Sequence, residues 1–284
     1  MSSELVTALD SFIAKRLPNL KYISLNWFGG EPLLAQDIIL KITETVKAAQ
    51  KNSNEKLTCY SSLTTNGYLL FPDTLKRLVN NGITSYQVTL DGIEENHDKT
   101  RRLINGKGTF SKIWSNIVGI RSTTIDCSIK LRLHYTEENY KDLIPLIQQI
   151  NDKLLDDKRF SIYFYAIGRY GGVNDNDIAE VPVEVQSKIS QYLGSFVKKD
   201  SIYKRTEKYI CYASQLNSFV IRSNGIIQKC DLCINSDANN VGHLNMDGTM
   251  FLDKQKIISW SKGLELRNIE AMRCPYRYFI KHSE

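Results

Sequence analysis

The sequence predicts an α/β fold built on a parallel sheet, followed by a small β module that carries cysteines. Two observations predict it. Over the first two-thirds of the 284 residues, short apolar runs alternate with segments whose apolar residues recur three and four positions apart, as in successive strand–helix units. From about residue 205 this alternation gives way to hairpin turns and clustered cysteines. We therefore place a boundary near residue 200, with residues 1–200 in the strand–helix domain and 201–284 in the cysteine module.

Five apolar and β-branched runs in the first domain have the length of strands. Helical patterns such as Ile38, Ile42 and Val46 separate them, and a loop at 168–182 leads to a further helix at 183–198. Repeated strand–helix units form a parallel sheet, either barrel-like or doubly wound. The predicted strands are residues 22–28, 57–63, 85–90, 128–135 and 160–167.

Charge and hydropathy exclude several classes of protein. The net charge of +6 is spread along the chain, and its densest basic cluster is the short run DKTRR, so we expect no nucleic-acid partner. No apolar stretch approaches the roughly 20 residues that span a bilayer, and the N-terminal segment has the pattern of an amphipathic helix and not of a signal peptide. We expect a cytoplasmic protein without a membrane partner, whose six cysteines are reduced.

Turn-forming and polar residues follow the first three predicted strands. These are Gly29-Gly30-Glu31-Pro32, then Thr64-Thr65-Asn66-Gly67, then Asp91-Gly92. The carboxyl ends of parallel strands meet at one edge of the sheet, where ligands bind. Each loop alone is also explained by ordinary turn chemistry, but three in succession predict a site. His97 has no metal-ligand partner at a suitable spacing, and we interpret it as a histidine at the surface or beside the site.

The cysteine module contains two predicted hairpins, with turns at Asn224-Gly225 and Asp247-Gly248. Thirteen residues separate Cys211 from Gly225 and four separate Gly225 from Cys230, so the first turn returns the chain towards Cys211. Four reduced thiols brought together suit an iron–sulfur cluster or structural zinc. They are Cys211, Cys230, Cys233 and Cys274, whereas Cys59 and Cys127 fall within strands and are interpreted as small core residues.

The strand-end motifs resemble a known family. WFGGEPLL, TTNGYLL and YQVTLDGIEENHDKTR followed by GKGTF are similar to the radical S-adenosylmethionine enzymes that modify peptides, which include the anaerobic sulfatase-maturing enzymes. The resemblance covers roughly residues 3 to 275. It implies a partial, TIM-like (β/α)6 barrel, here without its first strand, followed by a SPASM- or twitch-like module that holds auxiliary iron–sulfur clusters.

The resemblance also implies roles for single residues in binding S-adenosylmethionine. Gly29, Gly30, Glu31 and Pro32 match the element that receives its amino group, since a glycine pair exposes backbone carbonyls and Glu31 supplies charge. Thr89, usually a serine in the family, and Arg101 match positions near the methionyl carboxylate, which an arginine can hold bidentately. Asn66 matches the loop near the ribose.

In the cysteine module, the resemblance implies one auxiliary [4Fe-4S] cluster, held by Cys211, Cys230, Cys233 and Cys274. The closing cysteine run of the family is incomplete, because Ala271, Ile280 and Glu284 stand where further cysteines are expected. Asp231 matches the position of a proposed general base; a solvent-exposed aspartate at the end of a hairpin is the equally weighted alternative. The implied partners are a peptide or protein substrate and an electron donor such as flavodoxin or ferredoxin.

One element of the family pattern is missing. The C-x3-C-x2-C loop, whose cluster cleaves S-adenosylmethionine to a 5′-deoxyadenosyl radical, does not occur in these 284 residues. The ligands of the catalytic cluster are therefore absent, and we expect this chain alone not to cleave S-adenosylmethionine reductively. The retained GGEP, TNG and HDKTR elements favour an N-terminally truncated form of a peptide maturase. The alternative is a non-catalytic relative that binds a peptide or partner. An aldolase-like barrel would leave the cysteines unexplained.

Overall fold

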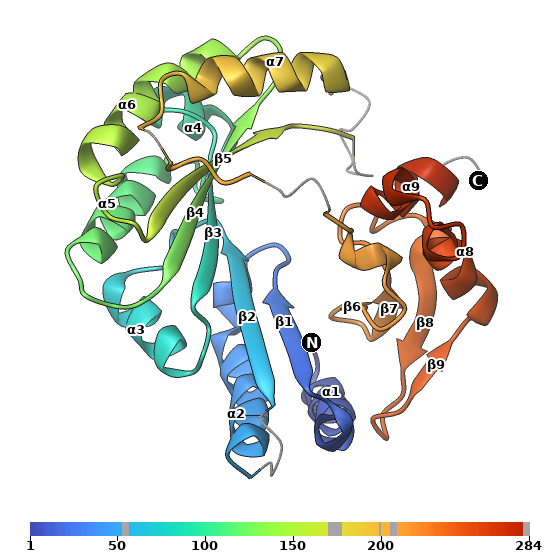
Figure 1. Cartoon of the computed structure of the whole chain (residues 1–284). Helices are drawn as coiled ribbons and strands as arrows, with labels where there is room; N and C mark the ends of the chain where they lie inside the picture. Colours follow the sequence, from blue (N-terminus) through green and yellow to red (C-terminus); the bar gives the residue numbers. More distant parts are fainter. Residues whose placement is uncertain (53–56, 170–177, 199, 205–208, 281–284) are drawn as a thin grey trace. The chain divides into compact units, whose positions relative to one another are not determined.

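The computed structural model describes residues 1–52, 57–169, 178–198, 200–204 and 209–280, and it divides into two compact units (Figure 1). The barrel unit comprises Asn19–Gly168 and Ala179–Lys204. The cysteine unit comprises Met1–Pro18, Arg169–Ile178 and Arg205–Glu284. No helix among the described residues is both long and apolar enough to cross a membrane.

The barrel unit confirms the predicted parallel sheet. Its strands are all parallel and follow one another in the order β1-β2-β3-β4-β5. A short sixth strand position follows the helix Val183–Gly194, because Ile202 forms a parallel bridge with Ile162 of β5. The strands are β1 Tyr22–Trp27, β2 Thr58–Thr65, β3 Ser85–Leu90, β4 Ser128–Tyr135 and β5 Phe160–Ala166.

Helices connect these strands and cover one face of the sheet, on the outer side of its curve in Figure 1. Gly82 follows α3 with a φ of +89°, a conformation that glycine adopts without strain after a helix. The helix predicted at 183–198 is present as α7, although it ends at Gly194. The helices of this unit are α2 Gln36–Asn52, α3 Pro72–Asn80, α4 Glu94–Thr100, α5 Phe110–Arg121, α6 Ile144–Lys153 and α7 Val183–Gly194.

The two faces of the sheet differ in chemistry, as β4 shows. Its alternate side chains Ile129, Leu131, Leu133 and Tyr135 are buried in the apolar core beneath the helices. The intervening side chains Ser128, Lys130, Arg132 and His134 lie on the opposite face, because successive strand residues point to opposite sides. Parallel sheets are usually apolar on both faces, so this polar face indicates a ligand-binding surface.

The cysteine unit contains an antiparallel sheet of four short strands in the order β6-β7-β8-β9. Both predicted hairpins are present, with Gly225 at a φ of +84° and Gly248 at +78°. Two helices follow the sheet. The elements are β6 Val220–Ile221, β7 Ile226–Gln228, β8 Asn240–Leu244, β9 Met250–Leu252, α8 Lys254–Glu265 and α9 Ile269–Arg273.

The N-terminal helix α1 (Ser3–Arg16) packs within the cysteine unit, whereas the sequence prediction placed it in the strand–helix domain. The physical reason is close approach at the two hairpin turns. A Cβ at Gly225 would lie 3.2 Å from Leu5 Cδ1, and one at Gly248 would lie 2.8 Å from Ser11 Oγ. Because glycine has no side chain, α1 can pack closely against both turns. Lys15 Nζ of this helix donates a hydrogen bond to the Asp247 carbonyl at 2.7 Å.

Candidate functional site

Glu31 joins the loops that follow β1 and β2. Its Oε1 accepts hydrogen bonds from Leu33 N at 2.9 Å and Thr65 Oγ1 at 2.8 Å, and its Oε2 accepts one from Asn66 N at 2.8 Å. The structure therefore brings together Glu31 and Asn66, as the sequence predicts. Because a carboxylate has about four acceptor positions, the three bonds leave one for a ligand, so Glu31 both shapes the site and can contact a cation.

The glycine pair before Glu31 borders open space. A Cβ built on Gly29 or Gly30 would meet no atom within 4 Å, and Gly29 has a φ of +149°. Pro32 then begins a short 3-10 helix, Pro32–Ala35, which the Glu31 side chain caps. This combination leaves open space at the glycine backbone beside a carboxylate, and such an arrangement suits a small cationic group.

The loop after β2 is held from within. Asn66 Oδ1 accepts a hydrogen bond from Tyr68 N at 2.8 Å. Gly67 has a φ of +83°, and a Cβ there would lie 2.8 Å from Val88 Cγ1. Glycine is required at this position on both counts, so the loop has one well-defined shape at the edge of the site.

Thr89 on β3 is paired with an arginine that the sequence motifs do not indicate, Arg132. The Thr89 hydroxyl is buried and accepts hydrogen bonds from Arg132 Nε at 3.0 Å and Nη2 at 2.8 Å. The strand register sets Thr89 opposite Arg132 on β4. Burial lowers the pKa of Arg132. The sequence feature that could have identified Arg132 is the run SIKLRLHY, which places three basic side chains on one face of a strand.

Arg101 lies in a cluster with Asp91 and His134. Its Nε donates to Asp91 Oδ2, and His134 Nδ1 lies 3.2 Å from Asp91 Oδ1. Burial opposes ionisation of Asp91, but the hydrogen bond from His134 and the charge of Arg101 outweigh it and lower the Asp91 pKa. Burial also lowers the pKa of His134, whose Nε2 is buried without a hydrogen-bond partner among the described residues.

His97 is fully buried, so of its two expected positions the surface is excluded and the one beside the site remains. Its Nδ1 accepts a hydrogen bond from Asp91 N at 3.3 Å, and its Nε2 lies 3.2 Å from Thr109 Oγ1. Burial lowers its pKa. His97 therefore fixes the loop after β3 and does not face a ligand.

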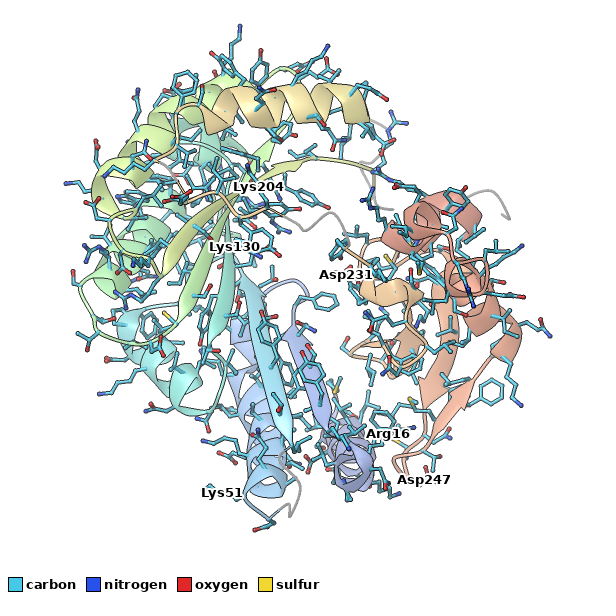
Figure 2. The ribbon with its side chains drawn as sticks, in the orientation of Figure 1. Arg16, Lys51, Lys130, Lys204, Asp231 and Asp247 are labelled. Atoms are coloured by element: carbon cyan, nitrogen blue, oxygen red, sulfur yellow. The ribbon has the colours of Figure 1, made fainter. Side chains whose placement is uncertain are left out.

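Tyrosine rings accompany the cations of the polar face. Lys130 Nζ lies 3.3 Å from the centre of the Tyr203 ring, and Arg132 Cζ lies 5.4 Å from that of Tyr165. Both contacts are cation–π interactions. Figure 2 labels Lys130 on the sheet of the barrel unit. This part of the sheet suits an anionic or polar ligand.

The four predicted cluster cysteines lie near one another. Leu232 N donates to Cys230 Sγ at 3.5 Å, and Cys211 N donates to the Met272 carbonyl at 2.9 Å, two residues before Cys274. Burial, helped by the neighbouring Cys230 and Cys274, raises the pKa of Cys211 to about 11. A hydrogen bond from Cys233 lowers the pKa of Cys230.

The arrangement of these thiols bears on what they can hold. Among the described residues, no three His, Cys, Asp or Glu side chains converge as a single metal ion requires. Single zinc ions draw their ligands to about 2.3 Å, whereas a four-iron cluster spreads its four thiolates around a larger body. Four thiols are a donor set that occurs both in iron–sulfur clusters and in structural zinc sites. Of the other two cysteines, Cys127 is buried in the core and Cys59 is half-buried.

Asp231 is half-buried and paired, not free in solvent. Tyr212 donates its hydroxyl hydrogen to Asp231 Oδ1, and Asp231 N donates to the Tyr212 oxygen at 2.9 Å. Burial, together with the Asp231 charge, raises the pKa of Tyr212. Tyr212 therefore orients the carboxylate of Asp231, the residue that follows Cys230 and is labelled in Figure 2.

Comparisons with known proteins identify a related family and a related sequence. Residues 12–150 match the Radical SAM superfamily. A cysteine-type anaerobic sulfatase-maturating enzyme of Clostridium novyi (strain NT) is 27% identical over 139 residues; the match covers 44% of this chain but only 36% of that protein.

Solved structures share the fold. Native anSMEcpe with bound AdoMet aligns with a TM-score of 0.65 and 20% identity, over 91% of this chain and 72% of that one. SuiB of Streptococcus suis aligns with a TM-score of 0.60 and 13% identity, over 90% of this chain and 61% of that one. Residues 12–150 thus form a radical SAM domain, in a chain that is homologous to the anaerobic sulfatase-maturating enzymes and shares their fold.

Proposed function

We propose that this chain binds S-adenosylmethionine at the carboxyl ends of β1, β2 and β3, as part of a radical enzyme that modifies a peptide or protein. The observation that carries the proposal is the pair of loops that Glu31 joins beside the open space at Gly29 and Gly30. A structural role for Glu31 alone would not require unfilled space at both glycines.

Each predicted residue has a role in this proposal. Backbone carbonyls at Gly29 and Gly30 and the remaining acceptor position of Glu31 receive the amino group, while Pro32 fixes the turn. Asn66 lies on the ribose side. Thr89 and Arg101 bind the carboxylate, and Arg132 joins them, because it already shares the Thr89 hydroxyl.

When S-adenosylmethionine is bound next to a reduced iron–sulfur cluster, it supplies a radical that abstracts hydrogen from a substrate. The three cysteines of that catalytic cluster are not among the residues of this sequence. The chain also covers little more than a third of its curated relative. The complete activity is therefore proposed for the enzyme that contains all these parts, and the described residues contribute cofactor and substrate binding.

The cysteine unit is proposed to hold one auxiliary [4Fe-4S] cluster through Cys211, Cys230, Cys233 and Cys274. Asp231, oriented by Tyr212, is the proposed general base. Anaerobic reconstitution is expected to load about four irons per chain, and Cys230→Ala is expected to lose them. Cys59→Ala is the control. Equal iron in both variants would contradict the ligand assignment.

The substrate is proposed to be a peptide or protein, and the electron donor a flavodoxin or ferredoxin. Solved relatives contain a Kp18Cys peptide or the precursor peptide SuiA. In this chain, the polar face with Lys130, Arg132 and their tyrosines provides hydrogen-bonding and charged groups along an extended surface.

Calorimetric titration with S-adenosylmethionine tests the proposal. The chain is expected to bind it, and Arg132→Met is expected to weaken binding about tenfold, whereas Lys141→Met on the same unit leaves it unchanged. Absence of saturable binding by a folded chain would refute the proposal.

A second candidate is a peptide- or partner-binding protein without radical chemistry, which would use the polar face and its tyrosines but would need no C-x3-C-x2-C motif. Sequencing the source DNA upstream of codon 1 separates the two. An in-frame strand with the motif supports the enzyme. An in-frame stop codon followed by a ribosome-binding site supports the binding protein.

A further inference from the structure

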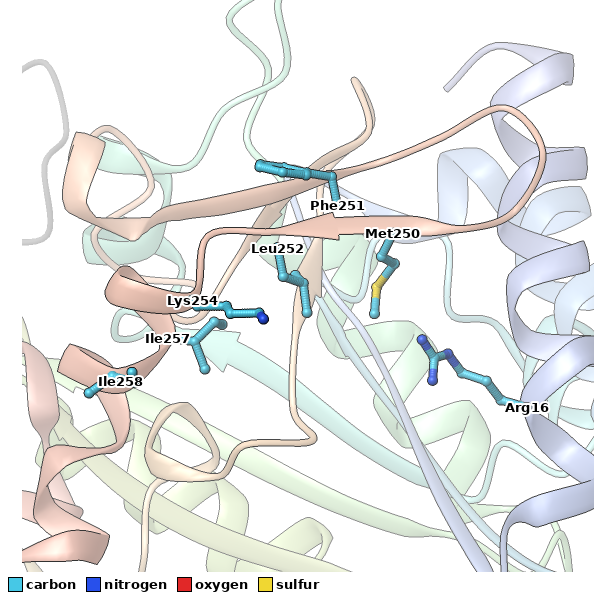
Figure 3. A pocket seen from close by; sticks show the side chains of 7 residues that line it. All are labelled: Arg16, Met250, Phe251, Leu252, Lys254, Ile257 and Ile258. Atoms are coloured by element: carbon cyan, nitrogen blue, oxygen red, sulfur yellow. The ribbon is translucent and has the colours of Figure 1, made fainter.

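A groove in the cysteine unit is lined by none of the cysteines. It has a volume of about 680 Å³ and is bordered by β9, by the start of α8 and by the end of α1. Met250 and Leu252 of β9 line one side and Ile257 and Ile258 of α8 another (Figure 3). Ile258 is 52% exposed, so apolar surface here is open to a partner.

Two cations stand at the ends of this groove. In Figure 3, Arg16 lies near Met250 and Lys254 near Leu252. Arg16 contacts the Phe12 ring, and neither cation forms an ion pair with any residue that the structure describes.

The acids closest in sequence to the groove have other roles. Asp247 accepts hydrogen bonds from Thr249 N and Oγ1, and Asp253 caps the start of α8 through Gln255 N and Lys256 N. The groove therefore has apolar sides and, at each end, a cation that forms no ion pair with a described residue.

β9 is also an edge strand, since it ends the order of its sheet. Towards β8, Asn245 N donates to the Thr249 carbonyl and Asp253 N to the Val241 carbonyl, each at 2.8 Å. In an antiparallel pair every second residue bonds to the neighbouring strand. The backbone groups of Met250 and Leu252 consequently point to the outer edge, where an added strand can pair with them.

We propose that this groove binds an extended acidic peptide segment as an added strand on β9. The peptide segment has a central apolar residue, with Glu or Asp two positions before it and two positions after it. Alternate residues of a strand share one face, so both carboxylates and the apolar side chain meet the groove together. The carboxylates pair with Arg16 and Lys254, and the apolar side chain packs between Met250, Leu252 and Ile257. This docking site is independent of S-adenosylmethionine binding.

Fluorescence anisotropy tests the proposal with two N-terminally labelled probes, Glu-Thr-Val-Thr-Glu-amide and Lys-Thr-Val-Thr-Lys-amide. The wild-type chain is expected to bind the acidic probe at least about tenfold more tightly, with affinity falling as salt rises. In the double variant Arg16→Glu, Lys254→Glu the preference is expected to reverse. Arg121→Glu, Lys141→Glu in the barrel unit is the control and keeps the wild-type preference.

Three results would overturn the proposal. They are no saturable binding of the acidic probe to the wild type, equal binding of both probes, and an unchanged preference in the folded groove variant. The salt titration needs no variant and remains decisive if the double variant does not fold. Sedimentation that shows a concentration-dependent dimer, abolished by the groove substitutions, would assign the groove to a second copy of the chain instead.

Discussion

The barrel unit and the cysteine unit are stabilised by different means. The barrel unit buries one continuous apolar cluster beneath its helices, including Leu78, Leu131 and Ile147, none of which is exposed. The strands of the cysteine unit are two to five residues long, and several of its fully buried residues are polar. The comparison indicates that hydrophobic periodicity determines the barrel, whereas specific polar contacts determine the cysteine unit.

Asn239 shows what this means for the cysteine unit. Its side chain accepts hydrogen bonds from Lys229 N and Cys230 N and donates to the carbonyls of Cys230 and Cys233. Lys229 is itself buried: its Nζ donates to the Gln215 and Ser218 carbonyls, and burial lowers its pKa to about 8. One amide side chain thus holds both central cysteines in place.

Replacing Asn239 by Ala is expected to have the largest effect on stability. It leaves buried backbone groups without partners, at about 1–3 kcal/mol each, so we expect a loss of about 4 kcal/mol in the unfolding free energy of the cysteine unit. Denaturant unfolding monitored by hydrogen exchange in each unit measures it. Asn245→Ala, which removes one solvent-exposed side-chain hydrogen bond in a turn, is the control and should change stability by less than about 0.5 kcal/mol. Equal losses of stability in Asn239→Ala and Asn245→Ala would show that buried polar contacts do not determine the cysteine unit.

Asp91→Asn tests the polar face of the barrel unit. Removing the carboxylate leaves Arg101 and His134 without their partner, and breaking such a pair costs about 3 kcal/mol. Chemical denaturation followed in the barrel unit gives the value. Asp156→Asn breaks the exposed contact with Lys198 and is expected to change nothing measurable. A loss no greater than that of the control would show that the polar face has no role in stability.

The sequence predicted the barrel unit well, because its pattern is local. The five strands differ from the expected runs by at most two residues at either end, and the loops at Glu31 and Asn66 meet because parallel strands end at one edge. Arg132 and His134 were missed because alternate basic residues on a strand are equally typical of a solvated face. Only the register between β3 and β4 places Arg132 beside Thr89.

The place of α1 could not be predicted for a different reason. The apolar face of α1 could pack against any apolar surface. Its position depends on two turns, more than 200 residues away in the sequence, whose glycines leave room for it. Gly225 and Gly248 were recognised as hairpin residues, but turn chemistry fully explained them. Close approach between distant segments leaves no periodic signal.

Gly248→Ala measures this close approach. A positive φ costs about 1 kcal/mol for alanine, and here the new Cβ would also lie 3.0 Å from Phe12 N. We expect a total loss of about 2 kcal/mol in the cysteine unit, with faster hydrogen exchange in α1. Gly106 has a similar φ of +81° but open space around it. Gly106→Ala is therefore expected to lose only the roughly 1 kcal/mol that the positive φ costs. If both variants lost the same stability, the helix would not depend on the turn.

The smallest expected effect is the pH dependence of the barrel unit. Burial lowers the folded-state pKa of His134 and of His97 below the ordinary value of 6.5. The unfolded chain therefore binds protons more readily, so this stability is complete above about pH 6.5 and is lost as the pH falls. Asp91 adds a second loss below about pH 3.8, because its folded-state pKa is also lowered. Thermal unfolding of wild type and His134→Gln between pH 5 and 8 should show a weaker dependence in the variant.

The central claim is that the loops after β1 and β2 form the binding site of S-adenosylmethionine, and Gly30→Val tests this claim most directly. Because a Cβ at Gly30 meets nothing within 4 Å, the variant is expected to keep the melting temperature of the wild type while its new side chain fills the proposed binding site. Isothermal titration should then show S-adenosylmethionine affinity falling at least about 100-fold, with Ala48→Val on the exposed face of α2 unchanged. Wild-type affinity in a folded Gly30→Val chain would contradict the account.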